Sequence, residues 1–215
     1  MTGMLRIFLT AIMSALILAV DFFNTAYAEM HEKPVVAVMD FGKHSDAASE
    51  IIIDNVGTMA SDYIIEALVE SKKFIVVAKD FMEETLVAEG LDTSGIIPPS
   101  RARKIGKILG VRYIIYGNVN DVNSDTLTVN VISNGADVHT VKALIIARMM
   151  DVETGDIVTA ARGEGQSKSS KVQVGTANVG YFTIGSKRVS QVSVHNAVKK
   201  AAYSMVELLI KRLED

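Results

Sequence analysis

The feature that most constrains this chain is an Asn-Gly pair, Asn134-Gly135, set between two long runs of strand-forming residues. Asn-Gly is typical of a two-residue type I′ turn, in which both central residues need a positive φ. The first run begins near Arg112 and the second ends near Asp151. Each predicted strand is therefore much longer than the roughly five or six residues of a typical strand. The pair predicts a long two-stranded ribbon with its tip at 134–135.

A turn centred on Asn134-Gly135 also predicts which residues of the ribbon face each other. Val131 then lies opposite Val138, and Val129 lies opposite Thr140, which makes one face mildly apolar near the tip. The pattern is compatible with three covers for that face: a neighbouring subunit, another part of the same sheet, or a membrane. The apolar alternation is much shorter than the roughly 9–11 residues of a membrane-spanning strand, so protein packing is favoured.

A second irregular region, 163–188, is rich in Gly, Ser and Lys and is predicted to form a second arm. Within it, Val172 and Val174 are expected opposite an alternating piece at 179–184. Both arms are expected to contact another subunit or a membrane. The residues expected at these contacts are Val129, Val131, Asn134, Gly135, Val138, Val172, Val174, Phe182 and Ile184.

The remaining segments alternate between short apolar strands and helices with one apolar face. The clearest helical stripes are at 56–68 and at 194–213, where apolar residues recur every three or four positions. The expected order is β-α-β-α-α-β-β-β-α. This order predicts an α/β domain, a mixed β-sheet covered by helices, with two extended β-hairpin arms. The strands are expected at 34–41, 74–78, 112–119 and onward, 141–150 and from 157, and the other helices from 80 and from 98.

The first 28 residues resemble an export signal. An apolar run at 7–20 is followed by Ala26-Tyr27-Ala28, the small-x-small pattern that precedes cleavage. The run is shorter than the roughly 20 residues of a spanning helix, so export is favoured over a membrane anchor. The sequence thus predicts a signal peptide at 1–28 and a single domain at 29–215, located in the periplasm or at the outer membrane.

No catalytic or cofactor-binding pattern is present. The four histidines, His31, His44, His139 and His195, share no metal-ligand spacing, and the chain has no cysteine. The segment 163–168 resembles a phosphate loop only faintly, because it lacks the Gly-Lys-Ser/Thr ending. We expect no enzyme activity, no cofactor and no bound metal. The net charge of −3 gives no argument for nucleic-acid binding.

Three polar features have a plain structural interpretation. Asp40 ends the first strand, where α/β proteins often place functional groups, but a turn-capping role is favoured. The segment 151–156 predicts a polar hairpin turn containing Gly155. The basic residues at 101–107 are expected on a solvated helix face, with contact to an acidic partner or to anionic lipid head groups as the alternative.

Five segments carry a family resemblance when they are taken in order. They are PVVAVMDF at 34–41, KFIVVA at 73–78, LGVRYIIYGN at 109–118, ARMMDVETGDIVTA at 147–160 and VSVHNAVKKAAYSMVELLIKRL at 192–213. Together they resemble the CsgG family, the curli secretion-channel subunits and their relatives. The resemblance implies a ring of subunits at the outer membrane, each contributing two β-hairpins to a pore, and the two predicted arms lie at the corresponding places.

This chain departs from the family pattern in two respects. It has no cysteine to carry the family's lipid, and the loop at 42–53 lacks the aromatic residues of the family's pore constriction. Two functions therefore stay open. The first is a secretion or envelope-assembly component that works as a homo-oligomer, with a secreted or envelope protein as partner. The second is a soluble periplasmic adaptor of the same fold that binds an envelope enzyme or polymer.

Overall fold

The computed structural model describes residues 33–43, 51–52, 55–91, 98–131, 134–171, 181–184 and 187–214. Residues Pro34–Asp215 form one structural unit, and the fold is the fold of this unit. The predicted signal peptide at 1–28 lies outside the described residues.

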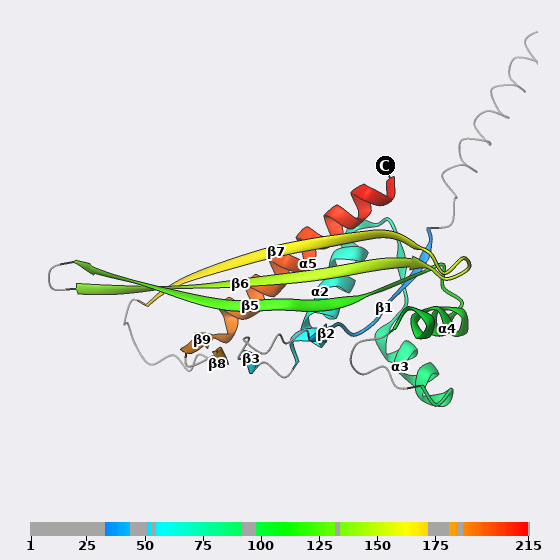
Figure 1. The fold of residues 1–215 in the computed structure, drawn as a ribbon, viewed down its shortest axis with the longest axis horizontal. Coiled ribbons are helices and arrows are strands. Elements are labelled where there is room, and N and C mark those ends of the chain that lie inside the picture. Colours follow the sequence, from blue (N-terminus) through cyan, green and yellow to red (C-terminus); the bar gives the residue numbers. More distant parts are fainter. Residues whose placement is uncertain are drawn as a thin grey trace, which may run out of the picture. The chain divides into compact units, whose positions relative to one another are not determined.

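A mixed β-sheet lies at the centre of this unit, with the strand order β4-β1-β5-β6-β7 (Figure 1). The short strands β1 and β4 run parallel to each other, and β1 runs parallel to β5. The long strands β5, β6 and β7 are antiparallel neighbours. The strands are β1 (Val35–Val38), β4 (Ile75–Val76), β5 (Tyr113–Val131), β6 (Asn134–Asp151) and β7 (Ile157–Lys171), and β2 (Gly42–Lys43) pairs with β5 beyond β1.

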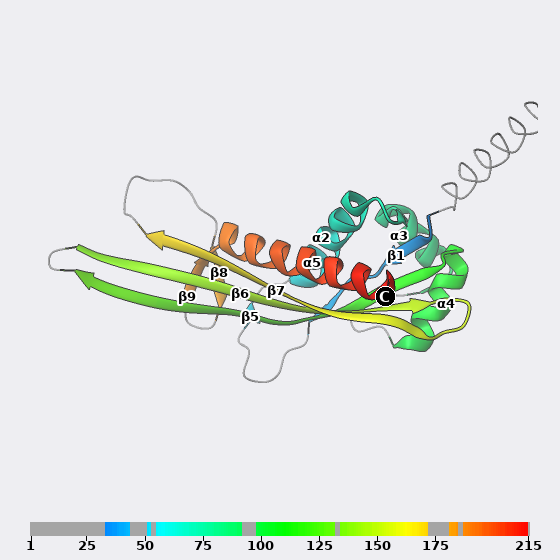
Figure 2. The same ribbon diagram turned by 90° about the horizontal axis from the view of Figure 1, so that it is seen from above.

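Helices cover the sheet, as predicted, and they lie on both of its faces (Figures 1 and 2). On one face, called the α5 face, lie α2 (Val56–Ser71) and α5 (Gln191–Glu214). On the opposite face, called the α4 face, lie α3 (Lys79–Ala88) and α4 (Pro99–Leu109), which cover only the end of the sheet near β1. The α/β fold class is therefore confirmed, and its layers are helix, sheet and helix.

Each face has its own hydrophobic core because alternate residues of a strand point to opposite faces. In β1, Val36 and Val38 belong to the core under α2 and α5. Ala37 and the following Met39 belong to the core under α3 and α4. The predicted helical stripes are confirmed, since Val56, Ala60, Ile64 and Leu68 of α2 and Val194, Val198, Ala201, Met205 and Leu209 of α5 are all buried.

The predicted ribbon exists, but the predicted tip is wrong. Asn134 and Gly135 lie in β6, where they pair with Val131 and Asn130. The connection at 132–133 lies outside the described residues. Val138 faces Leu127 instead of Val131. The β5 and β6 strands are paired from Tyr113↔Asp151 onward, and this register of the whole ribbon outweighs the local turn preference of Asn-Gly.

A β-bulge between Val119 and Asp121 helps to set that register. Val119 and Val122 are three residues apart, yet both are buried in the core of the α5 face. Regular alternation would put them on opposite faces, and the one extra residue of the bulge brings them onto the same face. The sequence pattern at 119–122 gave no sign of this irregularity.

The observed register can be tested with paired cysteines, because the natural chain contains none. The double variant Leu127→Cys/Val138→Cys should form an intramolecular disulfide on mild oxidation, since directly opposite strand residues meet the distance requirement. The variant Val131→Cys/Val138→Cys, which the Asn-Gly turn predicts to close, should stay reduced. Intact-mass measurement after thiol alkylation distinguishes the two. Closure of the second pair alone would show that the turn lies at 134–135.

The interpretation of 163–188 as one irregular arm is also wrong. Residues 163–171 belong to β7, which pairs with β6 as far as Asp137↔Lys171. Residues 172–180, which include Val172 and Val174, lie outside the described residues. The piece predicted to face them is instead part of a small antiparallel sheet. That sheet consists of β3 (Ile51–Ile52), β8 (Tyr181–Ile184) and β9 (Lys187–Ser190), in the order β3-β8-β9.

The glycines of β7 have a packing role that composition does not reveal. A Cβ on Gly165 would lie 2.0 Å from the Ala197 carbonyl oxygen, and one on Gly163 would lie 2.0 Å from the Ala201 carbonyl oxygen. The α5 backbone therefore rests directly on the strand (Figure 2). Glycine marks a close approach of two backbones here, which explains why a Gly-rich segment forms a regular strand.

Candidate functional site

The ribbon formed by β5, β6 and β7 extends beyond the helices that cover the sheet (Figures 1 and 2). Two edges of this ribbon are open in the described structure. On β5, the parallel partners end with the Lys43↔Val119 pair. On the other side, β7 has β6 as its only partner among the described strands. Open strand edges carry unpaired N–H and C=O groups, which makes them sites where another strand can add.

Two cations of α5 bind backbone carbonyls of the β7 edge strand. The Lys200 Nζ donates to the Gln166 carbonyl oxygen at 3.0 Å. The Arg212 Nη1 donates to the Ala160 carbonyl oxygen. Both side chains are long and exposed at the surface. Their bonds therefore satisfy two carbonyls of the edge strand, but the side chains can move aside when another strand pairs with it.

The uncovered α4 face of the ribbon is polar and carries both signs of charge. A hollow of about 490 Å³ on this face is lined by residues of all three strands. Lys142 pairs with Asp125 at 3.2 Å, and Arg162 pairs with Glu164 at 2.8 Å. Burial raises the pKa of Asp121 at the bulge, although its hydrogen bond from Asn123 acts in the opposite direction. This face suits water or a polar partner.

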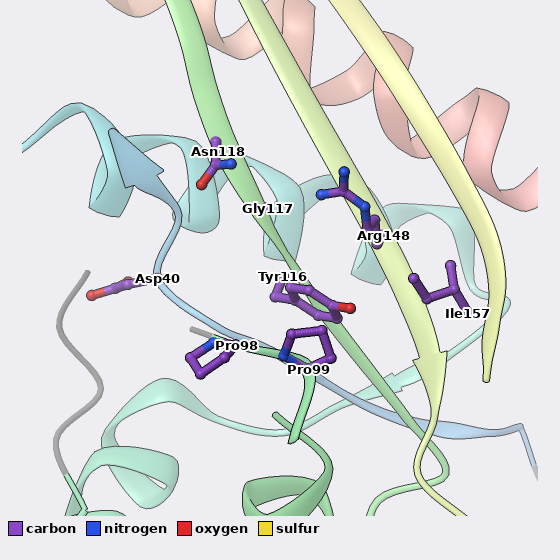
Figure 3. A pocket seen from close by; sticks show the side chains of 8 residues that line it. All are labelled: Asp40, Pro98, Pro99, Tyr116, Gly117, Asn118, Arg148 and Ile157. Atoms are coloured by element: carbon purple, nitrogen blue, oxygen red, sulfur yellow. The ribbon is translucent and has the colours of Figure 1, made fainter. Parts of the chain in front are cut away.

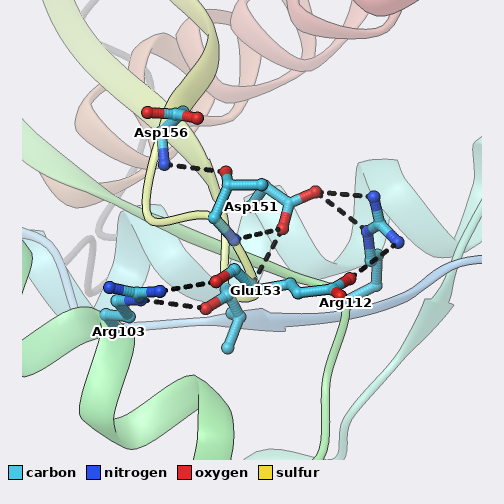
Figure 4. Close-up of polar contacts among 7 residues, drawn as sticks. Arg103, Arg112, Asp151, Glu153 and Asp156 are labelled. Carbon is cyan, nitrogen blue, oxygen red and sulfur yellow. Dashed lines mark hydrogen bonds and ion pairs between the residues drawn. The ribbon is translucent and has the colours of Figure 1, made fainter.

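At the opposite end of the ribbon, the predicted polar turn is confirmed (Figure 4). Asp151 is 4 % exposed, and its Oδ1 accepts hydrogen bonds from the backbone N–H groups of Glu153 and Thr154. Its Oδ2 accepts from Arg112 at 2.7 Å. Gly155 completes the turn with φ +86°. The carboxylate therefore organises a hairpin turn, as predicted.

One residue of the basic cluster holds the same turn (Figure 4). Arg103 on α4 donates from Nε to the Val152 carbonyl oxygen at 3.2 Å and from Nη2 to the Glu153 carbonyl oxygen. The expected solvated face is correct for the exposed Arg101, Lys104 and Lys107. The expectation of a solvated side chain is wrong for Arg103, because its guanidinium donates hydrogen bonds to two carbonyl groups of the turn.

The turn-capping role predicted for Asp40 is also wrong, because its carboxylate binds side chains of two helices. Its Oδ1 accepts from the Lys79 Nζ at 2.8 Å and from the Ser61 Oγ at 2.9 Å. Burial lowers the pKa of Lys79, but Asp40 and Asp62 outweigh this and raise it overall. The lysine is thus held charged, and it ties the carboxyl end of β1 to α2 and α3.

Asp40 also borders a cavity of about 280 Å³ on the α4 face (Figure 3). Tyr116 and Asn118 of β5 and Arg148 of β6 line the cavity together with the prolines that begin α4. The Tyr116 hydroxyl is buried and has no hydrogen-bond partner in the described structure. Burial raises the pKa of Tyr116, and the nearby charge of Arg148 opposes this effect. Sequence reasoning missed this site, although Arg148 in a strongly apolar strand was a visible signal.

The described residues predicted for the hairpin tips lie in three different strands. Val129 and Val131 lie in β5, and Val138 lies in β6. Phe182 and Ile184 lie in β8, where they pair with Val189 and Lys187 of β9. Whether any of these residues contacts a subunit or a membrane stays a prediction.

The histidines are not brought together as a metal site in the part of the chain that the structure describes. His195 on α5 shares a 3.0 Å hydrogen bond with the Tyr63 hydroxyl of α2, and His139 lies in β6. Within the described ranges, no group of three or more His, Cys, Asp or Glu side chains is placed to hold a metal ion. In the same ranges, no helix combines the length and the apolar character needed to cross a bilayer.

The fold and the ribbon define an α/β domain that extends a long antiparallel ribbon from a helix-covered sheet. The family model described as "Curli production assembly/transport component CsgG" matches residues 19–215. The chain belongs to the CsgG family, as the sequence resemblance indicated. The comparison with curated proteins found no match.

The solved structures to which this chain is similar include proteins from several bacteria. The LpoB C-terminal domain from Salmonella enterica has a TM-score of 0.43 and 18% identity, covering 61% of this chain and 82% of that chain. A lipoprotein from Neisseria meningitidis has a TM-score of 0.43 and 18% identity, covering 66% and 88%. The PelC dodecamer from Paraburkholderia phytofirmans has a TM-score of 0.38 and 12% identity, covering 84% and 88%.

Proposed function

We propose that this protein is a non-enzymatic, oligomeric component of a secretion or assembly system in the bacterial envelope. Family membership supports the envelope role. The observation that supports an oligomer is the projecting ribbon, which has one open edge on β5 beyond Val119 and another on β7. In this proposal the working unit is the exported domain 29–215, at the periplasmic face of the outer membrane or in the periplasm.

The two open edges belong to different strands, so they favour a head-to-tail contact. The β7 edge of one subunit would pair with the β5 edge of the next, and the backbone groups of both edges would become satisfied. A head-to-tail contact between identical subunits generates a ring when its rotation closes. The cations Lys200 and Arg212 would leave the β7 carbonyls when the neighbouring strand arrives.

A second candidate is a periplasmic adaptor that binds an envelope enzyme or polymer without forming a pore. It is favoured by the polar α4 face of the ribbon, where Lys142, Arg162 and Glu164 line an open hollow. Charged side chains that face lipid are costly, whereas they are suited to a hydrated partner. The two candidates differ in whether the assembled ribbons enter a membrane.

We expect Glu164→Pro to abolish oligomer formation without unfolding the subunit. The carbonyls of Ala160 and Gln166 bind α5 side chains, so even-numbered residues of β7 direct their backbone groups away from β6. Proline at 164 therefore removes an edge N–H and spares the β6 ladder. Light scattering with and without detergent measures the assembly, and circular dichroism checks the fold.

The control is Glu164→Thr, which removes the same charge but keeps the N–H group. It should assemble like the natural protein. A natural protein that stays monomeric in both conditions would refute the oligomer. Dye release from liposomes then separates the two candidates, since leakage supports a pore and an assembled ring without leakage supports the adaptor.

A further inference from the structure

The cavity on the α4 face contains a buried polar group that the fold itself does not use. Tyr116 is 6 % exposed, and its hydroxyl oxygen has no hydrogen-bond partner in the described structure. A buried hydroxyl without a partner costs about 1–3 kcal/mol. Phenylalanine would fill the same space without that cost. A tyrosine at this position is therefore better explained by a partner that comes from outside the chain.

The charges around the cavity favour an anionic partner. Asp40 pairs with Lys79 at 2.8 Å, and Lys79 also contacts Asp62, which does not line the cavity. Arg148 is exposed, and no carboxylate in the described part of the chain pairs with it. The cavity therefore has one unmatched positive charge beside a hydroxyl that keeps its proton, because burial raises the pKa of Tyr116. Both groups are hydrogen-bond donors, and a carboxylate is an acceptor that can satisfy both.

Part of the remaining wall is apolar. Pro98 and Pro99 lie beside the Tyr116 ring, and the hydroxyl end of the ring is directed to the side where Arg148 and Ile157 lie (Figure 3). Ile157 is 48 % exposed, which is high for an isoleucine. A ligand with a short apolar part would cover this surface, and each buried methylene would contribute about 0.8 kcal/mol.

We propose that this cavity binds a carboxylate carried on a short apolar group. Arg148 pairs with the carboxylate, the Tyr116 hydroxyl donates a hydrogen bond to it, and Pro98, Pro99 and Ile157 contact the apolar part. The hydroxyl is covered in this structure, so a neighbouring side chain must turn aside to admit the carboxylate, and the long, exposed side chain of Arg148 can do so. All lining residues come from one chain, so this site stands independently of the proposed ring.

The test uses 4-methylpentanoate and its neutral amide as paired probes, with calorimetry and the thermal midpoint as readouts. The carboxylate should bind and raise the midpoint, and the amide should not. Arg148→Gln and Tyr116→Phe should each weaken binding about tenfold or more, as expected for a lost bond to a charged group. Arg101→Gln, an exposed arginine of α4 outside the cavity, should bind like the natural protein.

Tyr116→Phe separates a ligand site from a structural role. The proposal requires the variant without ligand to be at least as stable as the natural protein, because the variant loses a buried unpaired hydroxyl. A large loss of stability in this variant would overturn the proposal, since the hydroxyl would then have a partner within the fold.

The source of the carboxylate is tested with a capped peptide, acetyl-Ala-Ala-Glu-Ala-Ala-amide, and its Gln counterpart. Binding of the Glu peptide alone would identify the carboxylate as a protein side chain. Binding of 4-methylpentanoate alone would identify a small molecule. Failure of both carboxylates to bind in an Arg148-dependent manner would overturn the site, whatever the oligomeric state of the protein.

Discussion

Replacing Gly165 by valine is expected to prevent this protein from folding. Even the first carbon of a side chain at 165 would lie 2.0 Å from the Ala197 carbonyl oxygen and 2.4 Å from the Ala201 backbone nitrogen. Both are backbone atoms of α5, so the whole helix would have to move away from β7. Overpacking typically costs about 1–3 kcal/mol, and contact with a rigid backbone places this case at or above the upper end.

The graded variant Gly165→Ala should fold with a free energy of unfolding lower by about 3 kcal/mol or more. The matched control is Glu164→Val, which adds an apolar side chain at the neighbouring position on the exposed side of the strand. It should change stability by no more than about 0.5 kcal/mol. Urea denaturation followed by circular dichroism measures all three. A Gly165→Ala variant as stable as the control would show that α5 does not rest on β7.

Replacing Asp151 by alanine is expected to give the second largest loss. The carboxylate accepts two backbone N–H groups of its own turn and the Arg112 guanidinium. The free energy of unfolding should fall by about 2–4 kcal/mol, given the strength of hydrogen bonds to charged groups. Asp156→Ala, in the same turn and exposed, should cost no more than about 0.5 kcal/mol. Equal losses for the two variants would contradict the role given to Asp151.

The contribution of Asp151 is also expected to depend on pH. Burial alone would raise its pKa, but the Thr154 and Glu153 amides and Arg112 outweigh burial and lower the pKa below 3.8. A depressed carboxyl pKa adds stability above the unfolded value, and this stability is lost as the pH falls through the folded pKa. The difference in the free energy of unfolding between the natural protein and Asp151→Asn should therefore be largest at neutral pH and should disappear in acid below pH 3.8. A difference that persists below pH 3.8 would show that the shape of the side chain, and not its charge, stabilises the turn.

The element types were accessible from the sequence wherever one strong local pattern acted alone. The stripes of α2 and α5 predicted both helices, because a one-sided apolar pattern at helical spacing must be buried to be stable. The long ribbon followed from two uninterrupted runs of strand-forming residues. The turn at 151–156 followed from its polar sequence and Gly155. Family membership followed from the order of five short segments.

The candidate sites were less accessible, because they depend on residues far apart in the chain. The cavity joins Asp40, Pro98, Tyr116 and Arg148, which lie on different elements. Asp40 was noticed in the sequence, but its partner Lys79 is 39 residues away, as their numbers show. No local pattern relates such residues. Only the packing of α4 across the sheet brings them to one place.

The sequence by itself determined the class of the fold, the ribbon and the two helices of the α5 face. Each of these depends on apolar periodicity, which is a local property of the chain. The tertiary structure decided the register of the ribbon and the role of the β7 glycines. Asn134-Gly135 favours a turn, but pairing along the whole of β5 and β6, with a bulge after Val119, outweighs one local preference. From the sequence alone, Gly163 and Gly165 suggest a flexible loop. In the structure the α5 backbone occupies the space that a side chain at either position would need, so the two glycines are required for packing.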